Sequence, residues 1–200
     1  MVWGESKVWM QGDENLSFYQ DALTDAAQKP EKDKSRKKII KPSGMPWELA
    51  PQGILKHMIN EQMNTRMETV DVYMQIIPGG SRSGKHRHLA EEALYVVEGH
   101  GYDLHQDCDV EITDTYHWIP QDEVKRFEWK AGDVIYVPPN TIHQHFNADP
   151  EQPARLISAI NRIYKNSGLN DLEQIENAPE YRPAVKLTAT MVEEMLRSQG

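Results

Sequence analysis

The spacing of apolar residues changes along the chain from a helical period to a strand period. Residues 15–27 carry apolar side chains at the spacing of one helix face, whereas residues 53–63 fit either a helix or a strand. Further along, apolar and polar residues alternate in short runs typical of strands: 67–77, 92–99, 124–130, 133–138, 143–147 and 154–164. Six strands without intervening helices predict an all-β fold, either an antiparallel sandwich or a closed barrel.

Turns and a helix cap mark the boundaries of this β region. Residues 78–80 and 138–140 are rich in Pro, Gly and Asn, which separate strands. Thr190 and Glu193 are spaced as a capping box, which predicts a short final helix. We therefore expect three parts: a helical and charged N-terminal extension over 1–45, a barrel over 46–165, and a C-terminal extension with a short helix over 166–200.

The composition fits one globular domain away from the membrane. The chain has 200 residues and a formal net charge of −9, which argues against nucleic acid as a partner because that needs a basic face. It contains no apolar run of the ~18 residues that a membrane span requires. The N-terminus lacks the pattern of a secretory signal, and a single cysteine, Cys108, fits a reducing interior. We expect a cytoplasmic protein.

One basic tract departs from the acidic balance. It runs from Lys29 to Lys41 and favours a solvated linker, because no aromatic residue is interleaved and no periodic face forms. The alternative is a contact with a nucleic acid, an acidic lipid or a phosphorylated substrate.

Three histidines and a glutamate form the candidate chemistry. His86 and His88 are two residues apart, so in an extended strand both imidazoles point to one face. Glu92 follows after a turn, and His143 must arrive from elsewhere in the fold. Three imidazoles and a carboxylate suit one divalent ion such as Fe, Mn, Ni, Co or Zn. The alternative is a metal-free barrel in which these histidines are only structural.

The spacing of these residues resembles the cupin superfamily. The first segment reads Gly80-x5-His86-x-His88-x3-Glu92-x6-Gly99 and matches the first cupin motif. The second reads Gly132-x5-Pro138-x-Asn140-x2-His143-x3-Asn147 and differs at Asn140, where cupins usually have Gly. Asn is the next best residue for a positive φ, so the turn is expected to form. The resemblance implies a jelly-roll antiparallel β-barrel and a homodimer. The long link from Gly99 to Gly132 predicts an extra projecting loop.

The amino-acid sequence around both motifs also resembles the gentisate 1,2-dioxygenase branch of cupins. The likeness lies in the segments HRHLAEEALYVVEGHG and WKAGDVIYVPPNTIHQHFN. It implies Fe(II) and O2 acting on an aromatic ring, with iron held by three histidines. This chain keeps Glu92, and four protein ligands leave two positions on a six-coordinate ion instead of three. Gentisate chemistry is therefore disfavoured, whereas a monodentate substrate beside O2 is compatible with the site.

Further residues near the motifs are candidates for catalysis and substrate binding. His145, two residues after His143, should face the interior and is a candidate proton donor or acceptor. Tyr73, Gln75 and Arg82 precede the first motif and are candidate substrate contacts, with Arg82 able to clamp a carboxylate. For His145 the alternative is a buried histidine that is hydrogen-bonded to the backbone, and for Arg82 the favoured alternative is a surface charge in a glycine-rich loop. The acidic inter-motif segment is expected to be a solvated loop, although its histidines make a second metal site conceivable. The histidines and acidic residues of this inter-motif segment are His100, His105, His117, Asp103, Asp107, Asp109, Glu111 and Asp114.

Three functions fit this sequence. The first is an Fe(II) dioxygenase acting on a small aromatic, dicarbonyl or carboxylate substrate. The second is a redox-neutral metal-dependent isomerase, decarboxylase or lyase. The third is a non-enzymatic, metal-dependent small-molecule binding protein, since a barrel alone does not decide function.

Overall fold

The computed structural model describes residues 11–197, except residues 13, 66 and 170, and these divide into two units between Arg36 and Lys37. The first unit contains α1 (Phe18–Ser35). This helix continues past the predicted end at residue 27. The added residues show no apolar period, and charged side chains form ion pairs along this part of the helix instead. Its ion pairs are Lys32 with Asp25, Lys34 with Glu31, and Arg36 with Asp33. The basic tract is thus partly neutralised by its own acidic neighbours.

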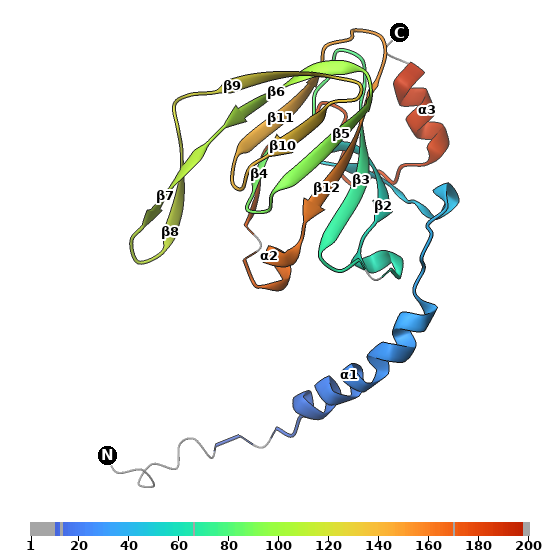
Figure 1. Cartoon of the computed structure of the whole chain (residues 1–200), viewed down its shortest axis with the longest axis vertical. Helices are drawn as coiled ribbons and strands as arrows, with labels where there is room; N and C mark the ends of the chain where they lie inside the picture. The colour runs from blue at the N-terminus through green and yellow to red at the C-terminus, as the bar shows by residue number, and fades with distance from the viewer. Residues whose placement is uncertain (1–10, 13, 66, 170, 198–200) are drawn as a thin grey trace. The chain divides into compact units, whose positions relative to one another are not determined.

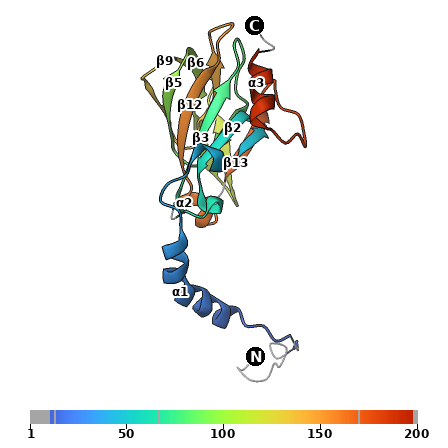
Figure 2. The same ribbon diagram turned by 90° about the vertical axis from the view of Figure 1, so that its right-hand side faces the viewer.

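The second unit is built from two large antiparallel sheets, shown from two directions in Figures 1 and 2. The six-stranded sheet has the order β1 (Trp47–Ala50), β2 (Gly53–Ile59), β3 (Val70–Ile77), β12 (Ala154–Asn161), β5 (Glu92–Glu98), β10 (Val134–Val137). The five-stranded sheet has the order β13 (Leu172–Glu176), β4 (Lys85–His88), β11 (Ile142–Asn147), β6 (His100–Gln106), β9 (Lys125–Lys130). The predicted all-β antiparallel fold is confirmed.

The apolar core lies between the sheets and follows the alternation of the strands. Along β12, for example, every second residue from Ala154 to Ile160 is buried, while the residues between them are partly exposed. The main core cluster comprises Ile77, Leu94, Val96, Trp129, Ile135, Val137, Ala154 and Leu156. Removing these side chains from water is the main stabilising contribution to such a fold. The described residues include no helix long and apolar enough to span a membrane.

The segment between the two motifs is folded, which corrects the expectation of a solvated loop. It forms β6 and then a hairpin of β7 (Cys108–Ile112) and β8 (Tyr116–Pro120), which projects beyond the two sheets in Figure 1. Asp103 and His105 of β6 are buried inside the barrel. The hydrophobic pattern missed β6 because its inward-facing residues are glycine, aspartate and histidine rather than apolar side chains.

The remaining segments complete the barrel. The ambiguous stretch 53–63 is β2 followed by a 3-10 turn, η3 (Glu61–Met63); η2 (Pro42–Gly44) precedes β1, and α2 (Ile163–Asn166) follows β12. The final helix, α3 (Ala189–Arg197), begins earlier than the predicted cap. Its cap is Thr188 rather than Thr190, because the Thr188 hydroxyl accepts the Met191 backbone N–H at 3.3 Å. Leu187 and Val192 then pack on the outer face of β1–β3.

Candidate metal centre

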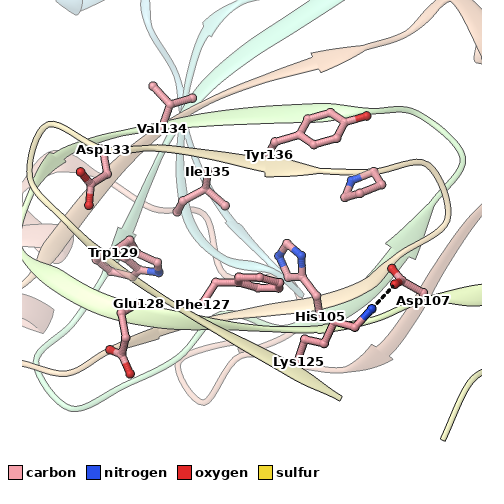
Figure 3. Close-up of a pocket in the computed structure, with 11 residues that line it drawn as sticks. His105, Asp107, Lys125, Phe127, Glu128, Trp129, Asp133, Val134, Ile135 and Tyr136 are labelled. Atoms are coloured by element: carbon pink, nitrogen blue, oxygen red, sulfur yellow. Dashed lines mark hydrogen bonds and ion pairs between the residues drawn. The ribbon is translucent and has the colours of Figure 1, made fainter. Parts of the chain in front are cut away.

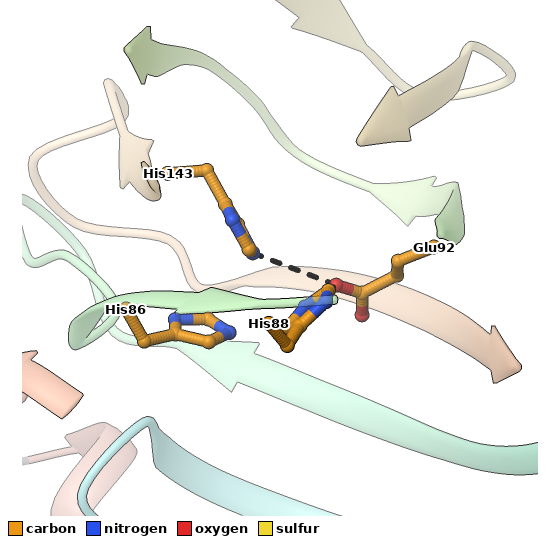
Figure 4. Close-up of side chains that lie close together, drawn as sticks. All are labelled: His86, His88, Glu92 and His143. Carbon is orange, nitrogen blue, oxygen red and sulfur yellow. Dashed lines mark hydrogen bonds and ion pairs between the residues drawn. The ribbon is translucent and has the colours of Figure 1, made fainter. Parts of the chain in front are cut away.

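Strand pairing brings the four candidate ligands together. His86 on β4 and His143 on β11 are direct partners across the sheet, so their side chains point to the same face. His88 follows two residues after His86, and Glu92 opens β5 on the facing sheet. One donor atom from each side chain lies within 4.8 Å of all the others, and all four residues are buried. Figure 4 shows the side chains pointing toward one another.

Backbone carbonyls orient all three imidazoles in the same way. Nδ1 of His86 lies 3.2 Å from the Gly84 carbonyl, Nδ1 of His88 lies 2.7 Å from that of Ala90, and Nδ1 of His143 lies 2.9 Å from that of Thr141. A carbonyl only accepts, so each Nδ1 carries the proton and each Nε2 presents a lone pair. This is the arrangement by which proteins prepare histidines for a metal ion.

Glu92 is held by one carboxylate oxygen and presents the other. Its Oε1 accepts the hydroxyl of Tyr73 at 2.9 Å and that of Ser158. Its Oε2 lies 3.2 Å from Nε2 of His88 and 3.5 Å from Nε2 of His143. Burial alone would raise the pKa of Glu92, but the neighbouring imidazoles of His143 and His88 hold this pKa well below its usual value. The group is therefore a carboxylate.

The donor set fits a divalent metal ion. Burial is the main cause that lowers the pKa of His86 and of His143, so both imidazoles are neutral donors near pH 7. Among the described residues, Nε2 of His143 has no hydrogen-bond partner although it is buried. Such an orphaned nitrogen is costly unless another group, such as a metal ion, uses it. The predicted ligands thus form one buried group of three histidines and a glutamate.

His145 belongs to a second buried polar group beside the first. Its ring centroid lies 5.5 Å from that of His143, and its Nδ1 lies 2.9 Å from Oδ1 of Asp103. Asp103 also accepts Nε1 of Trp129 at 2.7 Å and lies 3.3 Å from Nε2 of His105. Burial alone would lower the pKa of His145, but the Asp103 carboxylate raises it. Sequence reasoning missed Asp103 and His105 as interior residues.

The predicted substrate contacts occupy different places. Tyr73 is buried and binds Glu92, as described above. Gln75 is buried and donates its Nε2 to the Gln52 carbonyl at 2.9 Å. Arg82 is exposed and forms an isolated bridge with Phe146 on β11. Tyr73 therefore lies at the metal group, Gln75 binds the turn that contains Gln52, and Arg82 lies at the surface.

Gln52 is a site residue that no sequence pattern indicated. It lies in the turn between β1 and β2, and its Nε2 is 2.7 Å from Nε2 of His86. Its Oε1 lies 3.4 Å from the Tyr73 hydroxyl. A single glutamine in a turn, 34 residues before His86, carries no motif by which it could be found.

Arg87 supports the metal group from the other face of β4. Its guanidinium donates to Oδ1 of Asn140 at 2.9 Å, to both oxygens of Asp171 at 3.1 Å, and to Glu173 at 3.1 Å. Asn140 stands in the turn that precedes His143 and adopts the expected positive φ, 60°. One buried arginine therefore joins the strand of His86 and His88 to the turn of His143.

A pocket of about 540 Å³ lies between β9 and β10, and none of the four candidate ligands lines it. Figure 3 shows the Lys125–Asp107 ion pair at one end and Phe127 and Ile135 near the middle. His105 also lines the pocket, and its ring centroid lies 6.2 Å from that of His143. The lining residues are His105, Asp107, Lys125, Phe127, Glu128, Trp129, Asp133, Val134, Ile135, Tyr136 and Pro138. The pocket is thus next to the metal group but separate from it.

Solved structures share the fold of this protein. Two variants of oxalate decarboxylase from Bacillus subtilis superpose with TM-scores of 0.51 and 0.52, at 14% and 13% identity. Each match covers 87% of this chain and 42% of that protein, and at this identity it shows the fold alone. The two facing sheets and the buried group of three histidines and a glutamate define a cupin, as the motif spacing predicted.

The family within that class follows from the sequence comparison. The model of the auxin binding protein family matches residues 34–180, and the chain belongs to this family. The auxin-binding proteins T85 and T92 of Nicotiana tabacum are 25% and 24% identical to it over 96 residues. These alignments cover 48% of this chain and 48% of each relative, so the chain spans about half the length of the curated relatives it matches.

Proposed function

We propose that this protein is a mononuclear metal-dependent enzyme, an Fe(II) dioxygenase acting on a small aromatic, dicarbonyl or carboxylate substrate. The observation that carries the metal dependence is the convergence of three Nε2 lone pairs and one carboxylate oxygen in a buried group. His86, His88, Glu92 and His143 would hold the ion; the same donors also suit Mn, Ni, Co or Zn. When bound, iron would supply a Lewis acid and a path for electrons between substrate and O2.

Proton transfer is the role that we propose for His145. Its Nδ1–H donates to Asp103, which leaves Nε2 as the nitrogen that exchanges a proton with a substrate group. Asp103 in turn is fixed by Trp129 and His105, so the imidazole is held in one orientation. An imidazole with a buried carboxylate behind it is a common acid–base arrangement in enzymes.

For substrate binding we propose separate roles for the three predicted residues. Tyr73 holds Glu92, so its hydroxyl borders the space that the substrate enters. Gln75 acts through the turn that it anchors. Arg82 would reach only a substrate whose carboxylate extends to the surface, because its side chain is exposed.

The test is anaerobic purification with elemental analysis, followed by Fe(II) reconstitution and a panel of small acids and phenols. Oxygen uptake that depends on one member of the panel supports the dioxygenase. Turnover that persists anaerobically with Mn(II) or Zn(II) contradicts it and supports a redox-neutral isomerase, decarboxylase or lyase.

Family membership favours a second candidate, a non-enzymatic binding protein for an auxin-like aromatic carboxylate. The support is the family match and the names of the two tobacco relatives. Calorimetry with indole-3-acetate tests it, using the metal-loaded protein and the His86→Ala variant. Metal-dependent binding without turnover supports this candidate, whereas equal binding by the variant contradicts it.

We also propose a homodimer that forms through the outer face of the six-stranded sheet. Two rows of apolar residues cross β3, β12, β5 and β10 there: Met74–Ile157–Tyr95–Val134 and Val72–Ala159–Ala93–Tyr136. Tyr95, Val134 and Tyr136 are 48%, 67% and 59% exposed. Exposed apolar faces of this kind commonly mark protein–protein interfaces, and the occupant that we propose is a second copy of this chain. Light scattering should show a dimer for the wild type and a monomer for Val134→Lys; a wild-type monomer contradicts the proposal.

A cytoplasmic location is proposed on the single free cysteine, Cys108, which suits a reducing compartment. Fractionation of cells that express the untagged chain tests this location.

A further inference from the structure

The carboxamide of Gln52 lies beside the donor nitrogen of one proposed metal ligand. Its Nε2 is 2.7 Å from Nε2 of His86, the nitrogen whose lone pair faces the metal group. Two donors on one ion, each about 2.1 Å from it and at right angles, are about 3 Å apart. Gln52 therefore already stands beside His86 at the separation of two neighbouring ligands.

The position of this turn is built into the fold. The Gln52 carbonyl accepts both the Gly84 N–H at 3.0 Å and the buried Gln75 side chain at 2.9 Å. A Cβ on Gly84 would lie 2.4 Å from the Pro51 carbonyl oxygen, so only glycine lets the turn approach β4 this closely. Gly53, the next residue, has a φ of +125°, which favours glycine as well. These features hold Gln52 against the strand that carries His86 and His88.

The hydrogen bonds around Tyr73 indicate which way the carboxamide turns. Tyr73 has one hydroxyl proton but two acceptors, Oε1 of Glu92 at 2.9 Å and Oε1 of Gln52 at 3.4 Å. A half-turn of the carboxamide would let its NH2 donate to the Tyr73 oxygen while Tyr73 donates to Glu92. The same half-turn would set the Gln52 oxygen against the lone pair of His86. Two lone pairs at this separation repel each other unless a cation binds both.

We infer that Gln52 Oε1 is a fifth protein ligand of the metal ion, an inference that rests on the metal site of the proposed function. Five side-chain donors leave one open position on a six-coordinate ion. A substrate that chelates through two oxygens must then displace Gln52, and so must a monodentate substrate when O2 binds the ion beside it, whereas a monodentate ligand alone need not. Gln52 is thus a residue that sets which class of small acid the site accepts.

The test uses the full-length protein loaded with Mn(II), without substrate. The variants are Gln52→Ala, Gln52→Glu and, as a matched exposed control, Gln62→Ala. Removing a residue that only supports a metal ligand already weakens affinity by about 10- to 100-fold, so removing a ligand should cost at least as much. We expect that loss for Gln52→Ala, together with a rise in water-proton relaxivity equivalent to one added water on Mn(II). Gln52→Glu, which keeps an oxygen donor, should bind Mn(II) at least as tightly as the wild type without the added water.

Unchanged affinity and relaxivity in Gln52→Ala would overturn the inference. If Gln52→Ala does not fold, as judged by thermal unfolding, Gln52→Glu decides, and an added water in that variant also overturns it. Because no substrate is used, a failure of the dioxygenase proposal leaves this result unaffected. Failure of the wild type to bind Mn(II) would instead overturn the metal site itself.

Discussion

Arg87 offers a sharp test of how the barrel supports its metal group. The Arg87 side chain is 7% exposed, and the Asp171 side chain that it binds with two hydrogen bonds is 17% exposed. The substitution Arg87→Met removes the charge and all donors while keeping most of the apolar stem. It removes the side-chain hydrogen bonds from β4 to the Asn140 turn and to Asp171, while the backbone bonds of Asn140 N–H to His88 and of Leu89 N–H to Asp171 remain.

The expected loss of stability can be worked from these contacts. Breaking a buried ion pair by removing one partner costs roughly 3–5 kcal/mol, because the other charge stays buried. Glu173 adds little, since its side chain is 57% exposed. Asp171 still accepts Nε1 of Trp118, which offsets part of the loss. We therefore expect a loss of about 3 kcal/mol in the free energy of unfolding, measured by urea denaturation of the metal-free protein.

The matched control is Arg155→Met on β12. Arg155 also pairs with a carboxylate, Glu98, but the two side chains are 40% and 41% exposed. Such a pair contributes about 1 kcal/mol or less. Equal losses in the two variants, or a loss below about 1 kcal/mol for Arg87→Met, would refute the reasoning from burial.

Three further outcomes are expected. His86→Ala and His143→Ala should each lower the metal content severely, and full stoichiometric metal in either, by elemental analysis, would contradict the ligand assignment. His145→Ala should retain the metal but lose most turnover; unchanged turnover with the identified substrate would make His145 a structural residue. Without metal, the free energy of unfolding should fall as the pH drops below about 6.5. In the folded protein the pKa values of His86 and His143 are lowered, so these two imidazoles stay neutral, whereas in the unfolded chain they take up protons. The raised pKa of His145 has the opposite effect, but it is one group against two. The measurement is the urea midpoint at pH 7.5 and at pH 5.5, and a higher midpoint at pH 5.5 would contradict the prediction.

The four candidate ligands could be found from the sequence by two different routes. Residues two apart on a strand share a face, which predicted that His86 and His88 act together. The resemblance of the spacing to the two cupin motifs implied that Glu92 and His143 join them, and Asn140 has the positive φ that its place in the second motif requires. Both the strand period and the motif spacing can be read along the chain without knowledge of contacts between distant segments.

The supporting residues could not be found in this way because their roles depend on contacts between distant segments. Asp103 and His105 were assigned to a loop, since a strand whose inward side chains are polar has no apolar alternation to detect. Gln52 approaches His86 only because Gly84 lets a turn far earlier in the chain touch β4. Neither role can be recognised from the residues of a single strand.

The inner faces of the two sheets differ in composition, one mostly apolar and the other rich in histidine. This difference explains both the success and the failures of the sequence-based predictions. The inner face of the six-stranded sheet is mostly apolar, with Ile77, Leu94 and Leu156 in its core. The inner face of the five-stranded sheet carries five of the interior histidines, and Glu92 meets three of them from the opposite sheet. Hydrophobic alternation found β3, β5, β10 and β12 of the first sheet but only β9 and β11 of the second, and it missed β6. In a barrel of this type, an interior strand without an apolar pattern is therefore a reason to search for chemistry, as β6 shows with Asp103 and His105.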